Sequence, residues 1–507
     1  MCGIFFYKGL NTQHLREYFE KISHRGPDDH RYIEIDNNVL GFHRLSINGL
    51  DDTSGQPMKI GNSYLICNGE IYNYKELQKR FSIKLTTNSD CEIILHLYKK
   101  FGIKQTCELI NGEFSFVIYD NGQVYIGRDP LGIRSLYWYK DHEHFYVASE
   151  MKAIPPEIIQ VSQFPPGCYY NHYIKPYYNR NYKINYDLTE NEIHTQLQGL
   201  LIECVHERLM SDRPIGCILS GGLDSTLVTA IVAQKLGGSN LRTYTIGLEG
   251  GTDLVYARKA SKYLGTVHHE FIVSEEEFLN AIEETIYQIE SWDTTTVRAS
   301  VGNYLVAKKI KELGHDVVIF CGDVSDEIFG SYRGFQTAPN DEEFRKANEE
   351  MLKNIHFFDV LRSDKSISGA SLEARVPYGD KKFVDFVMSI PPHYKAFNED
   401  KIEKQILRKA FEGFLPHELL YRSKSAFSDA VSSKERSWFE IIQEHVENTF
   451  TPSIQYEGTY DKESLYYRTI FEKYYPGRAH TIPHYWRQPF SKNLDPSARL
   501  LEFHRED

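Results

Sequence analysis

The stretch ILSGGLDST (218–226) decides the fold of the second half of the chain. It joins an apolar segment to the predicted helix 224–237, and its glycines let backbone N–H groups approach an anion at the positive end of that helix. Ser220 and Ser225 can donate hydrogen bonds to phosphate oxygens, and Asp224 can hold Mg²⁺. A turn without a ligand would explain the glycines but not the polar residues around them. The stretch therefore predicts a phosphate-binding loop between a strand and a helix.

The sequence from about residue 193 alternates strands and helices around this loop. Apolar, β-branched strands are predicted at 214–220, 242–248, 269–273 and 316–322, each next to a helical pattern. The pattern after residue 273 predicts one long helix to about Ile289, and the chain after about residue 340 is mainly helical. This alternation predicts an α/β domain with a parallel, doubly wound sheet, which binds ligands beyond the carboxyl ends of its strands.

The first 150 residues have a different pattern. Short strands rich in aromatic and β-branched residues are predicted at 41–49, 63–72, 112–120 and 122–129, and Gly, Asn and Asp bound them. Helices are predicted at 11–26 and 89–102, the second with Ser89 and Glu92 as a capping box and Gly102 as its end. We expect an α+β domain of layered sheets here, and we expect the polar segment 171–192 to connect the two domains.

Composition excludes several function classes. The chain has 507 residues, which is enough for two or three domains, and its net charge is −12. An acidic chain repels phosphate backbones, so we expect no nucleic-acid partner. No apolar run approaches the ~20 residues of a membrane span, and the first ten residues lack the pattern of a signal peptide. The eight cysteines contain no CxxC pair, which favours a reducing cytoplasm over a disulfide framework.

The chain begins MCGIFFY, with a cysteine at its second position. Removal of Met1 would make Cys2 the N-terminal residue. A free α-amine has a pKa of about 7.7–8.0, so part of it is unprotonated at neutral pH and can accept the thiol proton. One residue then supplies both nucleophile and base. Taken alone, however, the residue also fits an ordinary buried cysteine near a strand.

Four further motifs decide between these interpretations: SHRGPDD (23–29), HRLSI (43–47), CNGEIYN (67–73) and NSDCE (88–92). With MCGI they resemble the class II glutamine amidotransferase domain, an N-terminal nucleophile fold of layered antiparallel sheets, over residues 2–180. The resemblance implies that Cys2 hydrolyses glutamine and that Asn68 and Gly69 donate to the oxyanion. It further implies a glutamine-binding set: Arg44, Leu45, Ser46, Ile47, Asn48, Asn68, Gly69, Glu70 and Asp90. Within this set Arg44 would pair with the α-carboxylate and Asp90 with the α-ammonium.

The second half resembles a second family. SGGxDS is the pyrophosphate loop of ATP pyrophosphatases, and GTVHHE (265–270), ESWDTTTVRAS (290–300), GDVSDEIFGSY (322–332) and LEARVPYGDKKF (372–383) are similar to glutamine-dependent asparagine synthetases. The resemblance implies a glutaminase domain at 2–180, a linker at 181–192 and a synthetase domain at 193–507. The implied substrates are aspartate, ATP and glutamine, which would give asparagine, AMP, pyrophosphate and glutamate.

The synthetase resemblance also implies site residues. ATP would contact Ile218, Ser220, Gly221, Gly222, Asp224, Ser225, Ile246, Cys321 and Gly322. Asp224 and Asp326 would hold Mg²⁺, and Lys424 would neutralise charge at the reacting phosphate. Asp323 stands where the family has a glutamate that handles the amine or the aspartyl intermediate. Its carboxylate is one methylene shorter.

Two neighbours of Asp323 also depart from the family pattern. Val324 replaces a glycine, which matters if that backbone needs a positive φ. Cys321 replaces a serine, and a thiol hydrogen-bonds more weakly than a hydroxyl. These departures put the rate and the choice of carboxylate substrate in question, while the fold expectation stands.

Three alternatives remain at the level of sequence. The same two domains could amidate another carboxylate, such as a peptide side chain or a metabolite. A regulatory relative without catalysis would be expected to lose the nucleophile or the acids, whereas Cys2, Asp224 and Asp326 are present. A stand-alone glutaminase would have no use for SGGLDS. The sequence leaves open whether the chain forms a homodimer.

Overall fold

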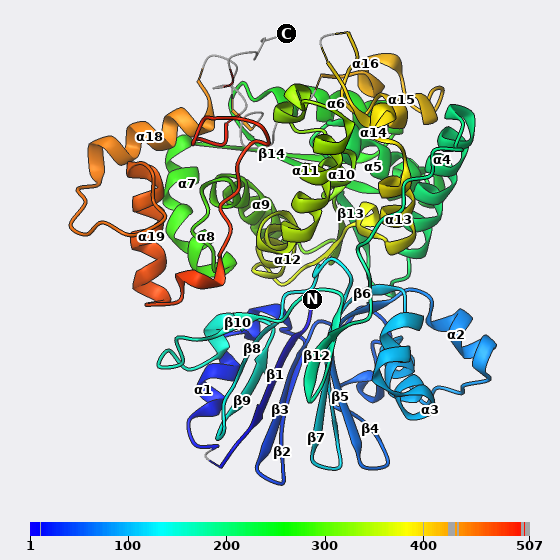
Figure 1. Ribbon diagram of the computed structural model, residues 1–507, viewed down its shortest axis with the longest axis vertical. Coiled ribbons are helices and arrows are strands. Elements are labelled where there is room, and N and C mark those ends of the chain that lie inside the picture. Colours follow the sequence, from blue (N-terminus) through cyan, green and yellow to red (C-terminus); the bar gives the residue numbers. More distant parts are fainter. Residues whose placement is uncertain (11, 399, 424–430, 433–435, 498–500, 502–507) are drawn as a thin grey trace.

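The computed structural model describes residues 1–10, 12–398, 400–423, 431–432, 436–497 and 501. The predicted site residue Lys424 lies outside the described residues. Two domains are stacked along the long axis of the molecule, and the N-terminus lies at their junction (Figure 1).

The N-terminal domain is built on two six-stranded antiparallel sheets. In spatial order the first contains β10 (Ser162–Gln163), β8 (Tyr137–Lys140), β9 (Phe145–Ala148), β1 (Gly3–Lys8), β3 (Asn38–Arg44) and β2 (Asp29–Ile35). The second contains β12 (Tyr173–Pro176), β11 (Cys168–Asn171), β7 (Gln123–Arg128), β6 (Gly112–Asp120), β5 (Ser63–Ile71) and β4 (Met58–Ile60). Alternate apolar residues of both sheets, such as Phe6, Leu40, Ile66 and Val117, form a core between them.

Helices cover the outer faces of these sheets. The helix α1 (Leu15–Glu20) buries Phe19 on the first sheet, and α2 (Tyr74–Phe81) and α3 (Glu92–Leu109) pack on the second. The four layers are visible in Figure 1. The predicted α+β fold of layered antiparallel sheets is confirmed.

Two local predictions in this domain are wrong. The helix predicted at 11–26 is regular only over α1. By contrast, the predicted helix end at Gly102 is a real break, because Gly102 has φ +78° and a kink there separates two helical stretches within α3. The capping box does not form, because the Glu92 carboxylate instead accepts bonds from the backbone N–H groups of Thr86 (2.9 Å) and Thr87 (2.7 Å). Within the segment 171–192, which was predicted to connect the domains, β12 pairs with β11 as a hairpin.

The C-terminal domain contains a five-stranded, fully parallel sheet. Its order is β15 (Val267–Val273), β14 (Arg242–Leu248), β13 (Ile215–Ile218), β16 (Val318–Phe320) and β17 (Glu373–Arg375). The helices α4 (Glu190–Glu207), α5 (Leu223–Leu236), α6 (Thr252–Leu264), α7 (Glu275–Asn280), α8 (Ile282–Ile289) and α9 (Thr294–Leu313) accompany it. The predicted doubly wound α/β fold is confirmed, although the long helix expected before Ile289 is divided into α7 and α8.

The remainder of the domain is mainly helical, as predicted. It contains α10 (Ser325–Phe329), α11 (Asp341–Asn354), α12 (Asp359–Ser368), α13 (Lys381–Ser389), α14 (Pro392–Lys395), α15 (Gln405–Ala410), α16 (His417–Leu420), α18 (Trp438–Thr449) and α19 (Lys462–Tyr474). The sequence pattern missed β17, which is only three residues long and is buried on the sheet. Across the described part of the chain, we find no helix with the length and apolarity of a membrane span.

Buried ion pairs join the two domains. Arg25 donates to Glu150 of its own domain (2.7 Å) and to Asp364 of α12 (3.0 Å). The carboxylate of Glu290, which follows α8, accepts from the backbone N–H groups of Met151 (2.8 Å) and Lys152 (2.7 Å). Loss of one partner from such a buried network costs about 3–5 kcal/mol. The domains are therefore held in one fixed arrangement.

Candidate active sites

The strand order brings the N-terminal motifs to one edge of the domain. β1 and β3 are antiparallel, with Gly3 opposite His43, so the start of β1 lies beside the end of β3. The Cys2 thiol lies 3.6 Å from the carbonyl oxygen of Leu45 there. The NGE motif occupies the last part of β5. This edge faces the C-terminal domain (Figure 1).

Burial controls the ionisation of the predicted nucleophile. It raises the pKa of the Cys2 thiol to about 12, so a neighbouring base is needed to form the thiolate. The structure includes Met1, whose α-amine donates to the carbonyl of Leu372 (3.2 Å). Burial lowers the pKa of that amine to about 6. Removal of Met1 would transfer the free α-amine to Cys2, next to the thiol.

Asn68 and Gly69, the predicted oxyanion donors, lie in the last part of β5. Asn68 is fully buried, and neither atom of its amide group has a hydrogen-bond partner among the described residues. Such orphaned polar groups are costly unless a ligand uses them. Gly69 has φ +154°, and a Cβ there would lie 2.2 Å from the carbonyl oxygen of Glu113 on β6. Only glycine fits this position.

We expect Asn68→Ala to lower kcat for glutamine hydrolysis about 10²–10³-fold, because one oxyanion donor is lost. Glutamate release in the absence of ATP measures this. Asn62→Ala, in the exposed turn before β5, is the matched control and keeps full activity. An Asn68→Ala enzyme with the control's rate would exclude the oxyanion role.

Charged and polar residues of the predicted glutamine-binding set form a cluster beside this edge. The Arg44 guanidinium donates to the backbone carbonyls of Asp51 (2.9 Å) and Gly49. Asn48 bridges the carboxylates of Glu70 and Asp90, the latter at 3.4 Å. Burial raises the pKa of Asp90 to about 6, and burial together with Asp90 raises that of Glu70. Two adjacent buried carboxylates are a receptor for an ammonium group.

The residues between Arg44 and Asn48 lie beside this cluster. Leu45 and Ile47 are buried in the core, and the Ser46 N–H donates to Asp28 (2.8 Å). Asp90 also accepts from the backbone N–H of Ile71 (2.6 Å). The structure thus brings the predicted glutamine-binding set together at one edge of the domain.

The raised pKa of Asp90 predicts a pH dependence. Below about pH 6 the carboxyl is protonated and cannot pair with the α-ammonium of glutamine. We expect kcat/KM for glutamine to fall about tenfold per unit below that pH. A titration of glutamine hydrolysis from pH 4.5 to 8 measures it. The limb in kcat should lie at lower pH, because bound ammonium stabilises the carboxylate. An acid limb in kcat/KM near pH 4, the ordinary range for aspartate, would contradict the assignment.

The phosphate-binding loop has the geometry that the sequence predicts. It connects β13 to α5. Gly221 has φ +72°, and a Cβ there would lie 2.4 Å from the backbone carbonyl carbon of Tyr256, so glycine is required. The Ser220 hydroxyl lies 3.0 Å from that of Ser225 and accepts from the N–H of Gly222 (3.3 Å). Both hydroxyls and the N-terminus of α5 therefore face the same space.

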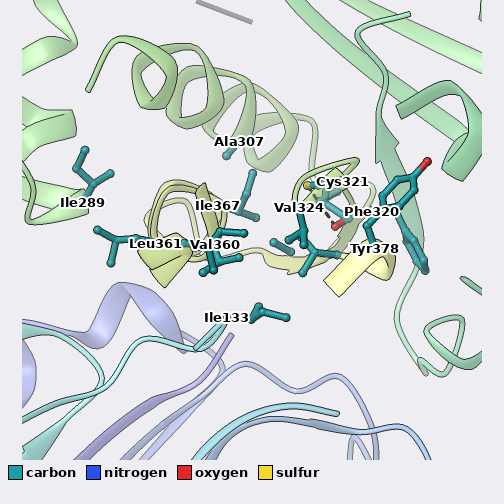
Figure 2. Close-up of a cluster of buried hydrophobic side chains, with 14 of the residues drawn as sticks. Ile133, Ile289, Ala307, Phe320, Cys321, Val324, Val360, Leu361, Ile367 and Tyr378 are labelled. Atoms are coloured by element: carbon teal, nitrogen blue, oxygen red, sulfur yellow. Dashed lines mark hydrogen bonds between the residues drawn. The ribbon is translucent and has the colours of Figure 1, made fainter. Parts of the chain in front are cut away.

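A second loop, after β16, packs directly on the first. A Cβ at Gly322 would lie 2.7 Å from the nitrogen of Ser225, so glycine is required for this approach. The next residues place Asp323 at the cavity and Val324 in the core, where Figure 2 shows it among buried apolar side chains. Val324 has φ +80°, so the backbone does need a positive φ here. The strain, about 1–3 kcal/mol, is offset by burial of the side chain.

Cys321 is buried at the start of this second loop. Its Sγ makes only a long contact, 3.8 Å, with the carbonyl oxygen of Ile319. Burial raises its pKa well above the ordinary value, so the side chain remains a neutral thiol. It contributes an uncharged wall to the cavity.

The predicted metal ligands converge on one point. The Lys404 ammonium contacts the carboxylates of Asp224 and Asp326, each at 2.6 Å, and Ser325 donates to Asp224 (2.7 Å). Although burial alone would lower it, the two acids raise the pKa of Lys404. Two carboxylates that share a cation between them are the oxygen donors that Mg²⁺ requires, so these residues fit the metal that the sequence predicts.

One cavity unites most of the synthetase residues. It is lined by Ile218, Ser220, Gly222, Asp224, Ser225, Cys321, Gly322, Asp323 and Asp326 from the predicted set. Gly221 and Ile246 are not among its lining residues; Gly221 shapes the turn, and Ile246 is buried in β14. Sequence reasoning missed Lys404 and Arg422 in this wall. Arg422 donates to the carbonyl of Ser220 (3.1 Å) and to Asp253 (2.7 Å).

Comparison with known proteins matches each half of the chain to a protein family. Residues 1–191 match the glutamine amidotransferase domain family, and residues 196–347 and 336–505 match the asparagine synthase family. A probable glutamine-hydrolyzing asparagine synthetase of Acanthamoeba polyphaga mimivirus is 39% identical over 548 residues, which cover 99% of this chain and 100% of the relative. The glutamine-hydrolyzing asparagine synthetase of Cricetulus griseus is 39% identical over 561 residues, covering 100% and 99%.

Among solved structures, a glutamine phosphoribosylpyrophosphate amidotransferase from B. subtilis matches with a TM-score of 0.31 and 16% identity, over 53% of this chain and 81% of that one. The two family matches and the full-length relatives agree with the two sites described above. The chain belongs to the glutamine-hydrolysing asparagine synthetase family.

Proposed function

We propose that this chain makes asparagine from aspartate, ATP and glutamine, and releases AMP, pyrophosphate and glutamate. One observation carries the proposal. A glutaminase-type nucleophile and an SGGxDS pyrophosphate loop lie on one chain, in domains joined by buried ion pairs. The relatives that match the whole chain bear the same activity in their names.

The N-terminal site would release ammonia. The Cys2 thiolate attacks the side-chain amide carbon of glutamine, the nitrogen leaves as ammonia, and water hydrolyses the thioester to glutamate. A tetrahedral oxyanion forms in both halves of the reaction. Asn68 and the Gly69 N–H, at the buried end of β5, would donate to it. Arg44 and Asp90 would fix the α-carboxylate and α-ammonium of the substrate.

The C-terminal site would activate aspartate. Its β-carboxylate attacks the α-phosphorus of ATP and pyrophosphate leaves, which gives β-aspartyl-AMP. Ser220, Ser225 and the N-terminus of α5 would hold the leaving phosphates. Asp224 and Asp326 would hold Mg²⁺, whose charge offsets that of the phosphates when bound. Lys424, outside the described residues, is proposed to neutralise charge at the reacting phosphate.

Ammonia then completes the reaction at the second site. It attacks the acyl carbon of β-aspartyl-AMP, and AMP leaves. The attacking nitrogen must lose a proton, and Asp323 lines the cavity with a carboxylate that can accept it. Asp323 therefore takes the place of the longer glutamate of the family.

Product analysis tests the proposal. Purified enzyme with aspartate, ATP, Mg²⁺ and glutamine should form asparagine, AMP, pyrophosphate and glutamate, and omission of any one component should stop asparagine formation. ADP and phosphate as products would exclude adenylation. AMP and pyrophosphate formed only when another carboxylate replaces aspartate would instead support an amidotransferase with a different acceptor.

We also infer a reducing, cytoplasmic location. All eight cysteines are unpaired in the structure, and six of them are buried in the N-terminal and synthetase cores. Secreted proteins of this size more often use their cysteines in disulfides.

A further inference from the structure

Two donors on consecutive residues of α12 hold the shortened carboxylate of Asp323. Arg362 donates to one oxygen of Asp323 (2.9 Å), and the Ser363 hydroxyl donates to the other. Arg362 also donates to Asp359 at the start of the same helix (2.8 Å). Ser363 is buried, with 1% of its surface exposed, so this contact does not compete with bulk water.

The loop that carries Asp323 and the helix α12 both have fixed positions. Asp323 is followed by Val324, whose positive φ turns the chain and whose side chain is buried in the core (Figure 2). The helix α12 is held by the buried ion pair of Arg25 with Asp364 (3.0 Å). A shorter side chain therefore cannot be compensated by free movement of either backbone. The hydroxyl of Ser363, on α12, instead reaches the shorter carboxylate of Asp323 and donates to it.

We propose that Ser363 is a positioning residue, which together with Arg362 orients the Asp323 carboxylate toward the reacting acyl group in place of the family's longer glutamate. This inference rests on the proposed function. A carboxylate that accepts a hydrogen bond on each oxygen is held in one orientation. General-base catalysis is sensitive to misplacement of the base by about 1 Å.

The chain offers a clean variant for the test. The Ser363 hydroxyl has a second acceptor, the carbonyl oxygen of Asp359 one turn earlier (2.9 Å), so altering Asp323 does not leave it unsatisfied. Ser366 lies on the same helix, is equally buried, and its hydroxyl has no partner among the described residues. Ser366→Ala is therefore the matched control for Ser363→Ala.

The experiment is a double-mutant cycle of Ser363→Ala and Asp323→Glu, with Ser366→Ala beside it. Asparagine formation from saturating ammonia is measured with the KM for ATP and with glutamine hydrolysis in the absence of ATP. We expect Ser363→Ala to lower kcat for synthesis about 10- to 100-fold, while the KM for ATP and glutamine hydrolysis change less than about twofold. Ser366→Ala should keep the wild-type rate.

The double variant, Ser363→Ala with Asp323→Glu, distinguishes a positioning role of Ser363 from a general loss of structure. In Asp323→Glu the added methylene pushes the carboxylate against Ser363, so we expect a loss of about tenfold or more. Removing the hydroxyl makes room for it, and the double variant should recover to within about threefold of wild type. Losses that multiply in the double variant would overturn the proposal, as would a wild-type rate in Ser363→Ala. A wild-type enzyme that forms no asparagine would overturn the proposed function itself.

Discussion

Replacement of Cys2 by alanine is expected to abolish asparagine synthesis from glutamine while leaving synthesis from ammonia intact. The thiol is the only group placed to attack the amide carbon in this proposal, and removal of a nucleophile costs about 10⁴-fold or more in kcat. The ATP-binding loop lies in the other domain, so adenylation should continue. Asparagine formation with each nitrogen source, measured side by side, gives the result.

Cys168→Ala is the matched control for this prediction. Cys168 is a half-buried cysteine at the start of β11, outside the predicted glutamine-binding set. It should use both nitrogen sources at the wild-type rate. If Cys2→Ala still used glutamine at that rate, the nucleophile would lie elsewhere. If it also lost the ammonia reaction, the two sites would not be chemically separate.

Features that one short segment determines could be predicted from the sequence. Asn68 and Gly69 belong to one strand, so their shared place near the end of β5 follows from the NGE motif itself. The requirement for a positive φ at Val324 could likewise be stated in advance, because the family pattern has glycine there. Parallel pairing of the strands followed from their alternation with helices.

Contacts between distant segments could not be predicted in this way. Lys404 contacts Asp224 across 180 positions of sequence, and no local pattern distinguishes it from a surface lysine. The pairing of Ser363 with Asp323 spans 40 positions and depends on how α12 packs below the sheet. The segment around Lys404 carries many other charged residues, so charge alone gave no signal for it.

The wrong local predictions have the same origin. Ser89 and Glu92 have the spacing of a capping box, but Thr86 and Thr87 offer Glu92 both backbone and hydroxyl donors. A carboxylate with several donors on a preceding loop prefers them to a single N–H at the helix start. Local sequence rules describe what a residue can do, and tertiary contacts choose among the options.

Asp224→Ala is expected to eliminate formation of AMP and pyrophosphate, by about 10³-fold or more, while glutamine hydrolysis continues. Asp224 lies in the first turn of α5 and supplies one of the two carboxylates that converge on Lys404. Its loss removes a ligand expected for Mg²⁺ and leaves the lysine with Asp326 alone. Pyrophosphate release in the presence of aspartate measures the first activity, and glutamate release without ATP measures the second.

A control variant and a chelation experiment test whether the expected loss is specific to the Asp224 carboxylate and to Mg²⁺, rather than a result of removing any acidic side chain. Asp341 is also an acid in the first turn of a helix, α11, but it is exposed and far from the cavity lining, so Asp341→Ala should keep both activities. Chelation of Mg²⁺ from the wild-type enzyme should reproduce the loss seen in Asp224→Ala and should spare glutamine hydrolysis. If Asp224→Ala kept pyrophosphate release, the SGGLDS loop would bind its anion without that carboxylate, and the adenylation assignment would have to rest on other residues.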